Sequence, residues 1–351
     1  MLRIIWFLLV IINFACNKVS QESSQSVPFP ENEKKENLLK RLRGLNELLE
    51  KNPKDASLLA ERANIHYLLG DSVRCFSDIQ KSIELKPNDA DFLYLKGFYA
   101  YNYDRIDTAL FYLKLSYEII NQNPDVMFYI GNCYFLKGNY EEAKNWYQKS
   151  IEKEENPNYF YALSLTYYKQ NQFKFTEKYL QKALEKDSTH GKSLALYAEL
   201  YLYNYKNYAK ANEYIQKLLK QEKLPVGDYL EGSLYFQKSL NVSDSVEKEG
   251  LLRLAIDSYS KAIKKDPHYI HAFYDRGYAF FLLKRFDLAS QSFEEVLKQN
   301  PKDYRAAFML GSISEYYDDK KLAKEYYEQA LKIKPDFKDA QQAIEDLYKV
   351  Y

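Results

Sequence analysis

The chain has 351 residues, of which 46% are hydrophobic and 28% are charged, so it carries enough apolar side chains for a buried core. Lys and Arg number 50 against 49 Asp and Glu, and this balance argues against the general positive field that nucleic-acid-binding proteins present to phosphates. With 11 Gly and 10 Pro there are few turn-forming residues, which favours long helices, and 16% of the side chains are aromatic.

Residues 1–15 have the layout of a signal peptide. Arg3 supplies a positive charge, and Ile4 to Ala15 forms a nearly unbroken apolar run that ends in a small residue. This run is about a dozen residues long, whereas a membrane-spanning helix needs about 20. We therefore predict a cleaved signal and not a permanent transmembrane anchor.

The pair Ala15-Cys16 resembles the lipobox of bacterial lipoproteins. The resemblance implies that Cys16 is lipidated, becomes the mature N-terminus and holds the protein to the bacterial envelope, facing the periplasm or the cell surface. Asn13 stands where that motif usually has an aliphatic residue. Ordinary cleavage, which would give a soluble secreted or periplasmic protein, and an uncleaved anchor are the two alternatives.

Two short segments follow the signal. Residues 16–37 are rich in Ser, Gln, Glu and Asn, with little to bury, and are predicted to form a disordered tether. Residues 38–55 are predicted to contain an N-terminal capping helix.

A period of 34 residues governs the rest of the chain. Prolines at 53 and 87, and again at 267, 301 and 335, are separated by 34. Small residues keep nearly the same step at Ala63, Gly97, Gly131, Ser164, Ala198, Gly232, Gly277 and Gly311. The single step of 45, between Gly232 and Gly277, indicates an insertion of eleven residues, which we place as a loop around Leu240 to Gly250. A fixed period of this size indicates a repeat array.

The repeated positions resemble the tetratricopeptide motif, as in Tyr129-Ile130-Gly131-Asn132-Cys133-Tyr134 followed by Ala143 and Tyr147. The resemblance covers residues 56–337 in eight units. It implies an all-α fold, a right-handed superhelical solenoid of about eight helical hairpins, and residues 338–351 are predicted to form a C-terminal capping helix. The fifth unit departs from the motif with Lys210 at a small position, so its packing is expected to be looser.

In this family, places 2, 5, 9 and 12 of the first helix of each unit line a concave groove. The resemblance therefore predicts a partner-binding groove formed by Asn64, Tyr67, Tyr94, Phe98, Tyr101, Phe128, Asn132, Phe135, Tyr161, Tyr168, Tyr274 and Tyr278. Aromatic rings offer rigid contact area, and a protein or peptide is the predicted partner. Some of these rings alternatively serve only to pack helices together.

We find no phosphate-binding glycine loop, serine nucleophile motif or zinc-ligand spacing, and the four histidines are scattered. The sequence predicts neither an enzyme nor a cofactor, a metal site, a small-molecule substrate or a nucleic-acid partner. The leading hypothesis is a membrane-tethered scaffold that binds a protein or peptide in the aromatic groove and assists assembly of envelope complexes. The alternative is an architectural spacer that uses its convex face or its ends.

Overall fold

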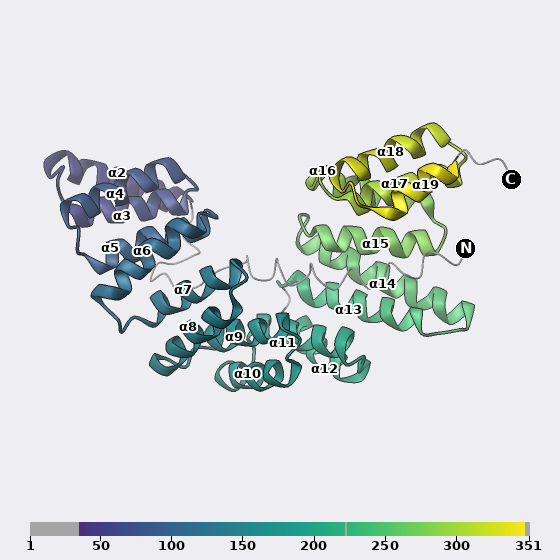
Figure 1. Cartoon of the computed structure of the whole chain (residues 1–351), viewed down its shortest axis with the longest axis horizontal. Coiled ribbons are helices and arrows are strands. Elements are labelled where there is room, and N and C mark those ends of the chain that lie inside the picture. Colours follow the sequence, from purple (N-terminus) through teal and green to yellow (C-terminus); the bar gives the residue numbers. More distant parts are fainter. Residues whose placement is uncertain (1–34, 222, 348–351) are drawn as a thin grey trace. The chain divides into compact units, whose positions relative to one another are not determined.

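The computed structural model of the protein describes residues 35–221 and 223–347, and within these residues the regular secondary structure is helical, without strands. The chain divides into two compact units, of which residues 35–190 form the first and residues 191–347 the second. Each unit contains four helical hairpins (Figure 1). The predicted all-helical fold of eight hairpins followed by a terminal helix is confirmed.

The N-terminal unit starts with a single helix and continues with four hairpins. Its helices are α2 (Lys35–Lys51), α3 (Ala56–Leu68), α4 (Ser72–Leu85), α5 (Ala90–Asn102), α6 (Ile106–Ile119), α7 (Pro124–Leu136), α8 (Tyr140–Lys153), α9 (Pro157–Lys169) and α10 (Phe173–Lys186). We call the first helix of each hairpin its A helix and the second its B helix. Residues 35–37, which lie in the predicted tether, belong to α2, while Cys16 and the predicted signal lie outside the described residues.

The C-terminal unit holds the other four hairpins and a final helix. Its helices are α11 (Gly191–Glu199), the π-helix η3 (Leu200–Asn204), α12 (Tyr208–Leu219), α13 (Pro225–Leu240), α14 (Ser245–Lys265), α15 (Ile270–Leu282), α16 (Phe286–Gln299), α17 (Tyr304–Tyr316), α18 (Lys320–Ile333) and α19 (Lys338–Leu347). Helix α19 packs on the last hairpin through Leu347, which lies against Tyr327 and Ala323.

Short polar side chains set where the helices begin. Asp55, Asp89 and Asn123 each accept two hydrogen bonds from the first backbone N–H groups of the A helix that follows. Except in the sixth hairpin, the turns between A and B helices use a left-handed residue, such as Gly70 at φ 77° and Gly138 at φ 75°. Because glycine has no Cβ, it adopts this conformation at little cost and ends the A helix sharply.

A glycine on the A helix lets a B-helix ring pack against the backbone. A Cβ at Gly131 would lie 2.6 Å from Cε1 of Tyr147, and one at Gly311 would lie 2.5 Å from Cε1 of Tyr327. Hairpins with Ala at this A-helix position, such as that of Ala63, pair it with an aliphatic residue, here Ile79. The second hairpin differs, because Gly97 faces the aliphatic Leu113, whose Cγ would lie 2.7 Å from an added Cβ.

The loop predicted around Leu240 to Gly250 in the sixth hairpin is present but shorter than predicted. Only residues 241–244 are non-helical, because Asp244 accepts a hydrogen bond from the Glu247 N–H at 2.7 Å and begins α14. Asp244, in the polar run from Asn241 to Ser245, is therefore the N-cap residue of α14. The insertion instead lengthens both helices, giving 16 residues in α13 and 21 in α14.

The fifth hairpin absorbs one extra residue as a π-helix. Ala198 and Ala211 are thirteen residues apart, where the other regular hairpins have twelve, and η3 takes up the difference between them. Ala211 and Leu218 are both fully buried, so the expected looser packing is not observed. Lys210 lies beside the small position and not in it, and its Nζ lies 5.0 Å from the centroid of the Tyr201 ring.

Candidate functional site

The predicted groove residues lie on one side of the A helices, which we call the A-helix face of each unit. None of the twelve is an exposed side chain. Six are buried, namely Asn64, Phe98, Tyr161, Tyr168, Tyr274 and Tyr278. The other six keep part of their surface accessible, namely Tyr67, Tyr94, Tyr101, Phe128, Asn132 and Phe135. All six of these lie on α3, α5 and α7, so the accessible part of the predicted site belongs to the N-terminal unit.

Aromatic packing between neighbouring A helices explains much of this burial. The Phe98 ring lies 5.5 Å from Tyr67 on α3 and 5.2 Å from Tyr129 on α7, and only 1% of Phe98 is exposed. Tyr101 meets Tyr129 edge-on at 5.4 Å. These rings stabilise the contacts between successive hairpins, typically by about 0.5–1.5 kcal/mol for each pair beyond simple area burial. Phe98 is therefore part of the core in this structure.

The two predicted groove amides are held by tyrosines of the chain itself. The Tyr99 hydroxyl donates to Asn64 Oδ1 at 3.2 Å, and the Tyr147 hydroxyl donates to Asn132 Oδ1 at 2.7 Å. Asn64 is 1% exposed and so serves the core. Asn132 is partly accessible, and its amide nitrogen has no acceptor among the described residues, so it remains able to donate to a partner.

The remaining accessible rings form a candidate binding surface, which we call the aromatic surface. It consists of Tyr67, Tyr94, Tyr101, Phe128 and Phe135, with Asn132 among them. Phe128 is anchored by Tyr147 at 5.9 Å and by Tyr159 at 5.0 Å, and Phe135 by Tyr140 at 5.5 Å. Because the rings are held from behind, they present apolar area that loses little entropy on binding.

The C-terminal unit places charged groups beside the aromatic residues of α13, α15 and α17, and the sequence analysis missed these charges. The Tyr229 hydroxyl donates to Asp275 Oδ2 at 2.9 Å. Arg305 pairs with Asp303 at 2.9 Å and lies 4.7 Å from the centroid of Tyr274. Burial raises the pKa of Asp275 to about 6, although the Tyr229 hydrogen bond and the Arg305 charge oppose the rise. The sequence signal that could have revealed these charges is Asp275, a carboxylate directly after the aromatic Tyr274.

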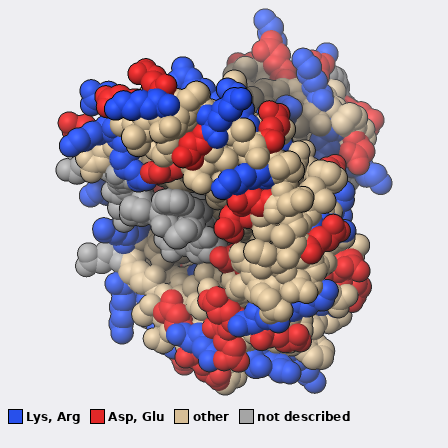
Figure 2. Space-filling model, turned by 90° about the vertical axis from the view of Figure 1, so that its left-hand side faces the viewer, with Lys and Arg blue, Asp and Glu red and all other residues tan. Residues whose placement is uncertain are grey.

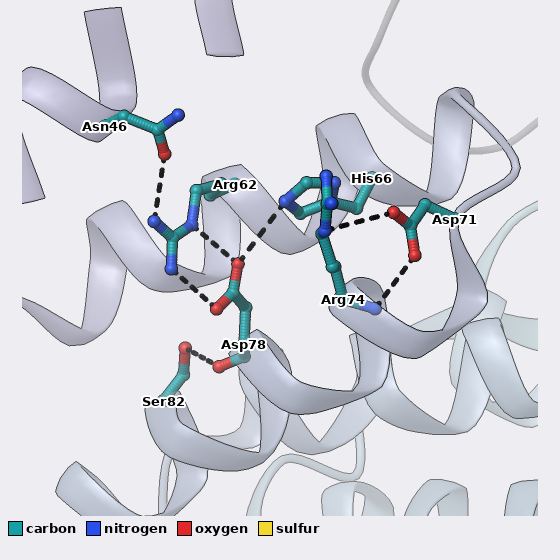
Figure 3. A network of polar contacts seen from close by, with 7 residues as sticks. All are labelled: Asn46, Arg62, His66, Asp71, Arg74, Asp78 and Ser82. Atoms are coloured by element: carbon teal, nitrogen blue, oxygen red, sulfur yellow. Dashed lines mark hydrogen bonds and ion pairs between the residues drawn. The ribbon is translucent and has the colours of Figure 1, made fainter. Parts of the chain in front are cut away.

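A polar network in the first hairpin ties three helices together (Figure 3). Arg62 on α3 donates to both carboxylate oxygens of Asp78 on α4, at 2.7 and 2.8 Å, and to Asn46 Oδ1 on α2 at 3.0 Å. His66 lies 3.9 Å from Asp78, beyond hydrogen-bond distance. Burial lowers the pKa of His66, which Asp78 only partly opposes. The fork-like pairing indicates a structural role in joining helices.

The cysteines of the described region are free thiols. Cys75 and Cys133 are buried, and burial raises the pKa of each thiol to about 12. Both are therefore protonated and poorly reactive near neutral pH. Over residues 35–221 and 223–347 there is no group of three or more His, Cys, Asp or Glu placed to hold a metal ion. Across those same ranges, the helices are too short or too polar to cross a membrane.

Charges of both signs are interspersed on the face shown in Figure 2, with uncharged side chains between them. This distribution agrees with the near-equal numbers of basic and acidic residues. Residues 35–347 therefore present no single-signed field on this face that would steer a polyanion towards it.

Two family models match parts of the chain. Residues 270–303 and 304–337 match the tetratricopeptide repeat, and residues 102–161 match the anaphase-promoting complex, cyclosome, subunit 3 family. Among curated proteins, the chain is 28% identical over 127 residues to interferon-induced protein with tetratricopeptide repeats 2 of Cricetulus griseus, an alignment that covers 31% of this chain and 27% of that protein. It is 30% identical over 110 residues to the protein SGT1 homolog of Bos taurus, covering 31% of this chain and 30% of that protein.

The chain thus spans less than a third of the length of these curated relatives. Among solved structures, the human IFIT1 dimer with m7Gppp-AAAA is similar, with a TM-score of 0.63, 17% identity, and coverage of 89% of this chain and 77% of that one. At this identity the likeness concerns the fold. The tetratricopeptide matches cover the seventh and eighth hairpins, residues 270–337, and there they confirm the predicted repeats.

Proposed function

Because two of its hairpins match the tetratricopeptide repeat, we propose that this protein is a membrane-tethered scaffold whose aromatic surface binds a protein or peptide partner. Tetratricopeptide proteins are generally non-enzymatic and act in protein–protein interaction and the scaffolding of complexes. The observation that carries the proposal is the group of partly accessible rings on α3, α5 and α7, which includes Tyr94 and Phe128 and surrounds the Asn132 amide.

The chemistry of this surface favours an extended segment with apolar side chains. Rings give contact area without charge, and the Asn132 amide nitrogen supplies a hydrogen-bond donor for a backbone carbonyl. A buried aromatic anchor at the centre of an interface typically contributes about 2 kcal/mol or more. Two such anchors account for a specific interaction of moderate affinity.

The membrane tether rests on the sequence. The short apolar run that ends at Ala15-Cys16 supports lipidation of Cys16, and residues 17–34 provide a spacer between the lipid and α2. The proposed location is the bacterial envelope, facing the periplasm or the cell surface. A scaffold held in this way would gather envelope proteins into complexes.

The test compares two faces of the N-terminal unit. We expect Tyr94→Ala with Phe128→Ala to lower recovery of cross-linked partners from membranes at least tenfold, while circular dichroism shows the helices intact. The matched control is Phe111→Ala with Phe175→Ala, because these rings are 58% and 48% exposed on B helices. Loss of partners only in the control variant would support the architectural spacer, for which those exposed rings are the specific evidence. Recovery that is equal in all variants would contradict both.

A further inference from the structure

The sixth hairpin carries a structural addition that the other seven lack. Helix α14 has 21 residues, whereas the B helices α4, α6, α8, α10, α16 and α18 have 14 each. The extra turns lie at its N-terminal end, which Asp244 caps. Figure 1 shows α13 and α14 side by side as a long hairpin, next to α15.

This addition forms one wall of a groove of about 570 Å³, which we call the extension groove. The other wall is the C-terminal end of α15 and the turn that follows it. The groove is lined by Ser245, Lys248, Glu249, Leu252, Arg253, Ile256, Asp257, Phe280, Leu282, Leu283, Lys284 and Arg285. Its size lies within the range of about 300–1,000 Å³ that is usual for binding sites.

The floor of the extension groove is apolar. Leu252 and Ile256 are buried at its base, and Phe280, Leu282 and Leu283 keep part of their surface accessible. Covering this apolar surface with a partner contributes a favourable binding free energy of roughly 25 cal/mol for each Å² removed from water.

The rim is predominantly positive. Four basic and two acidic side chains line the groove. Arg253 is neutralised by Glu249 at 2.6 Å, and Arg285 lies 3.9 Å from Asp287. Lys248 and Lys284 have no carboxylate within 4.0 Å among residues 35–221 and 223–347. An occupant therefore needs carboxylates to complement them.

The spacing of the α14 residues that line the groove indicates the shape of the molecule that would bind there. The α14 residues of the lining fall at 245, 248, 249, 252, 253, 256 and 257, which is one face of a helix over about three turns, or roughly 18 Å. A straight, apolar-floored groove of this length is suited to an amphipathic helix laid along it. We propose that the extension groove binds an amphipathic helix of a partner protein that carries acidic residues beside its apolar stripe. This site is separate in its residues from the aromatic surface and does not depend on it.

The experiment uses the full chain and a fluorescein-labelled synthetic helix of about 18 residues, with Leu and Glu at the spacing of one helical face. We expect fluorescence anisotropy to show binding that weakens at least tenfold in Lys248→Glu with Lys284→Glu, in line with the loss of two close charge pairs. The matched control, Lys302→Glu with Lys321→Glu, changes the net charge equally at exposed sites outside the groove and should bind within twofold of the original protein.

Two altered peptides test separately the charge complementarity and the apolar contact on which the proposed binding depends. Replacing Glu by Gln, or Leu by Ala, should each remove measurable binding. Unchanged affinity of the Lys248→Glu, Lys284→Glu variant, or equal weakening in the control variant, would overturn the proposal. So would binding of phosphatidylglycerol vesicles through the same lysines in the absence of peptide binding, because the groove would then serve a lipid surface. Thermal melts of both variants establish that they are folded.

Discussion

Gly131→Ala tests the close packing of Tyr147 against α7. The added Cβ would lie 2.6 and 2.7 Å from two carbon atoms of the Tyr147 ring, which is only 1% exposed and has no room to withdraw. Overpacking of this kind costs about 1–3 kcal/mol, whereas alanine gains about 1 kcal/mol over glycine in helix propensity. We expect a net loss of up to about 2 kcal/mol, and a loss of several kcal/mol for Gly131→Leu.

The assay is thermal unfolding followed by circular dichroism, where about 1 kcal/mol corresponds to roughly 2–4 °C for a unit of this size. The control is Gly250→Ala in α14, because a Cβ there would meet no atom within 4 Å and the helix should gain stability. Adding Tyr147→Ile to Gly131→Ala should restore part of the loss, since Ala63 is accommodated in the same cluster as the aliphatic Ile79. If Gly131→Ala melts at or above the temperature of the original protein, the proposed packing is refuted.

Three further perturbations address charge and attachment. Between about pH 4 and pH 6, native Asp275 binds more protons than the unfolded chain. Stability should therefore fall as pH rises through this range, by on the order of 3 kcal/mol, and melts of Asp275→Asn should lack this fall. Asp78→Ala leaves Arg62 without its carboxylate and should lower the free energy of unfolding by about 2–4 kcal/mol, as measured with denaturant. The control Asp107→Ala, which breaks an exposed ion pair with Lys137, should change it by less than about 1 kcal/mol. Cys16→Ser should release the protein from membranes in fractionation, and an unmodified mature N-terminus in the intact mass would contradict lipidation.

The sequence predicted the hairpins well because small residues at fixed spacing reflect a steric requirement within each hairpin. The missed details have local causes. The polar run from Asn241 to Ser245 did mark the connection between two helices, but it did not show that the rest of the insertion lengthens both of them. The thirteen-residue spacing between Ala198 and Ala211 did signal an irregularity, but spacing alone does not show that a π-helix takes up the extra residue.

The candidate site was harder to predict for a different reason. Phe98 and Asn132 occupy the same place, place 9, of the A helix in neighbouring hairpins. Phe98 is nevertheless buried between helices, whereas Asn132 remains partly accessible. The difference depends on the size of residues on the adjacent hairpins, which a motif does not encode. Asp275 and Arg305 lie near each other across two hairpins, and such proximity requires knowledge of how successive hairpins are packed.

Tyrosines contribute to this array either through a hydroxyl hydrogen bond or through ring packing alone, and Tyr→Phe substitutions distinguish the two. Tyr147 donates to Asn132 at 2.7 Å across the hairpin, so Tyr147→Phe should lower the free energy of unfolding by about 0.5–1.5 kcal/mol. It should also release the Asn132 carbonyl oxygen and alter partner affinity. Tyr101 makes its closest aromatic contact with Tyr129 through its ring, so Tyr101→Phe keeps that contact and should leave stability nearly unchanged. Equal losses in denaturant unfolding of the two variants would mean that the Tyr147 hydrogen bond does not contribute to joining α7 and α8.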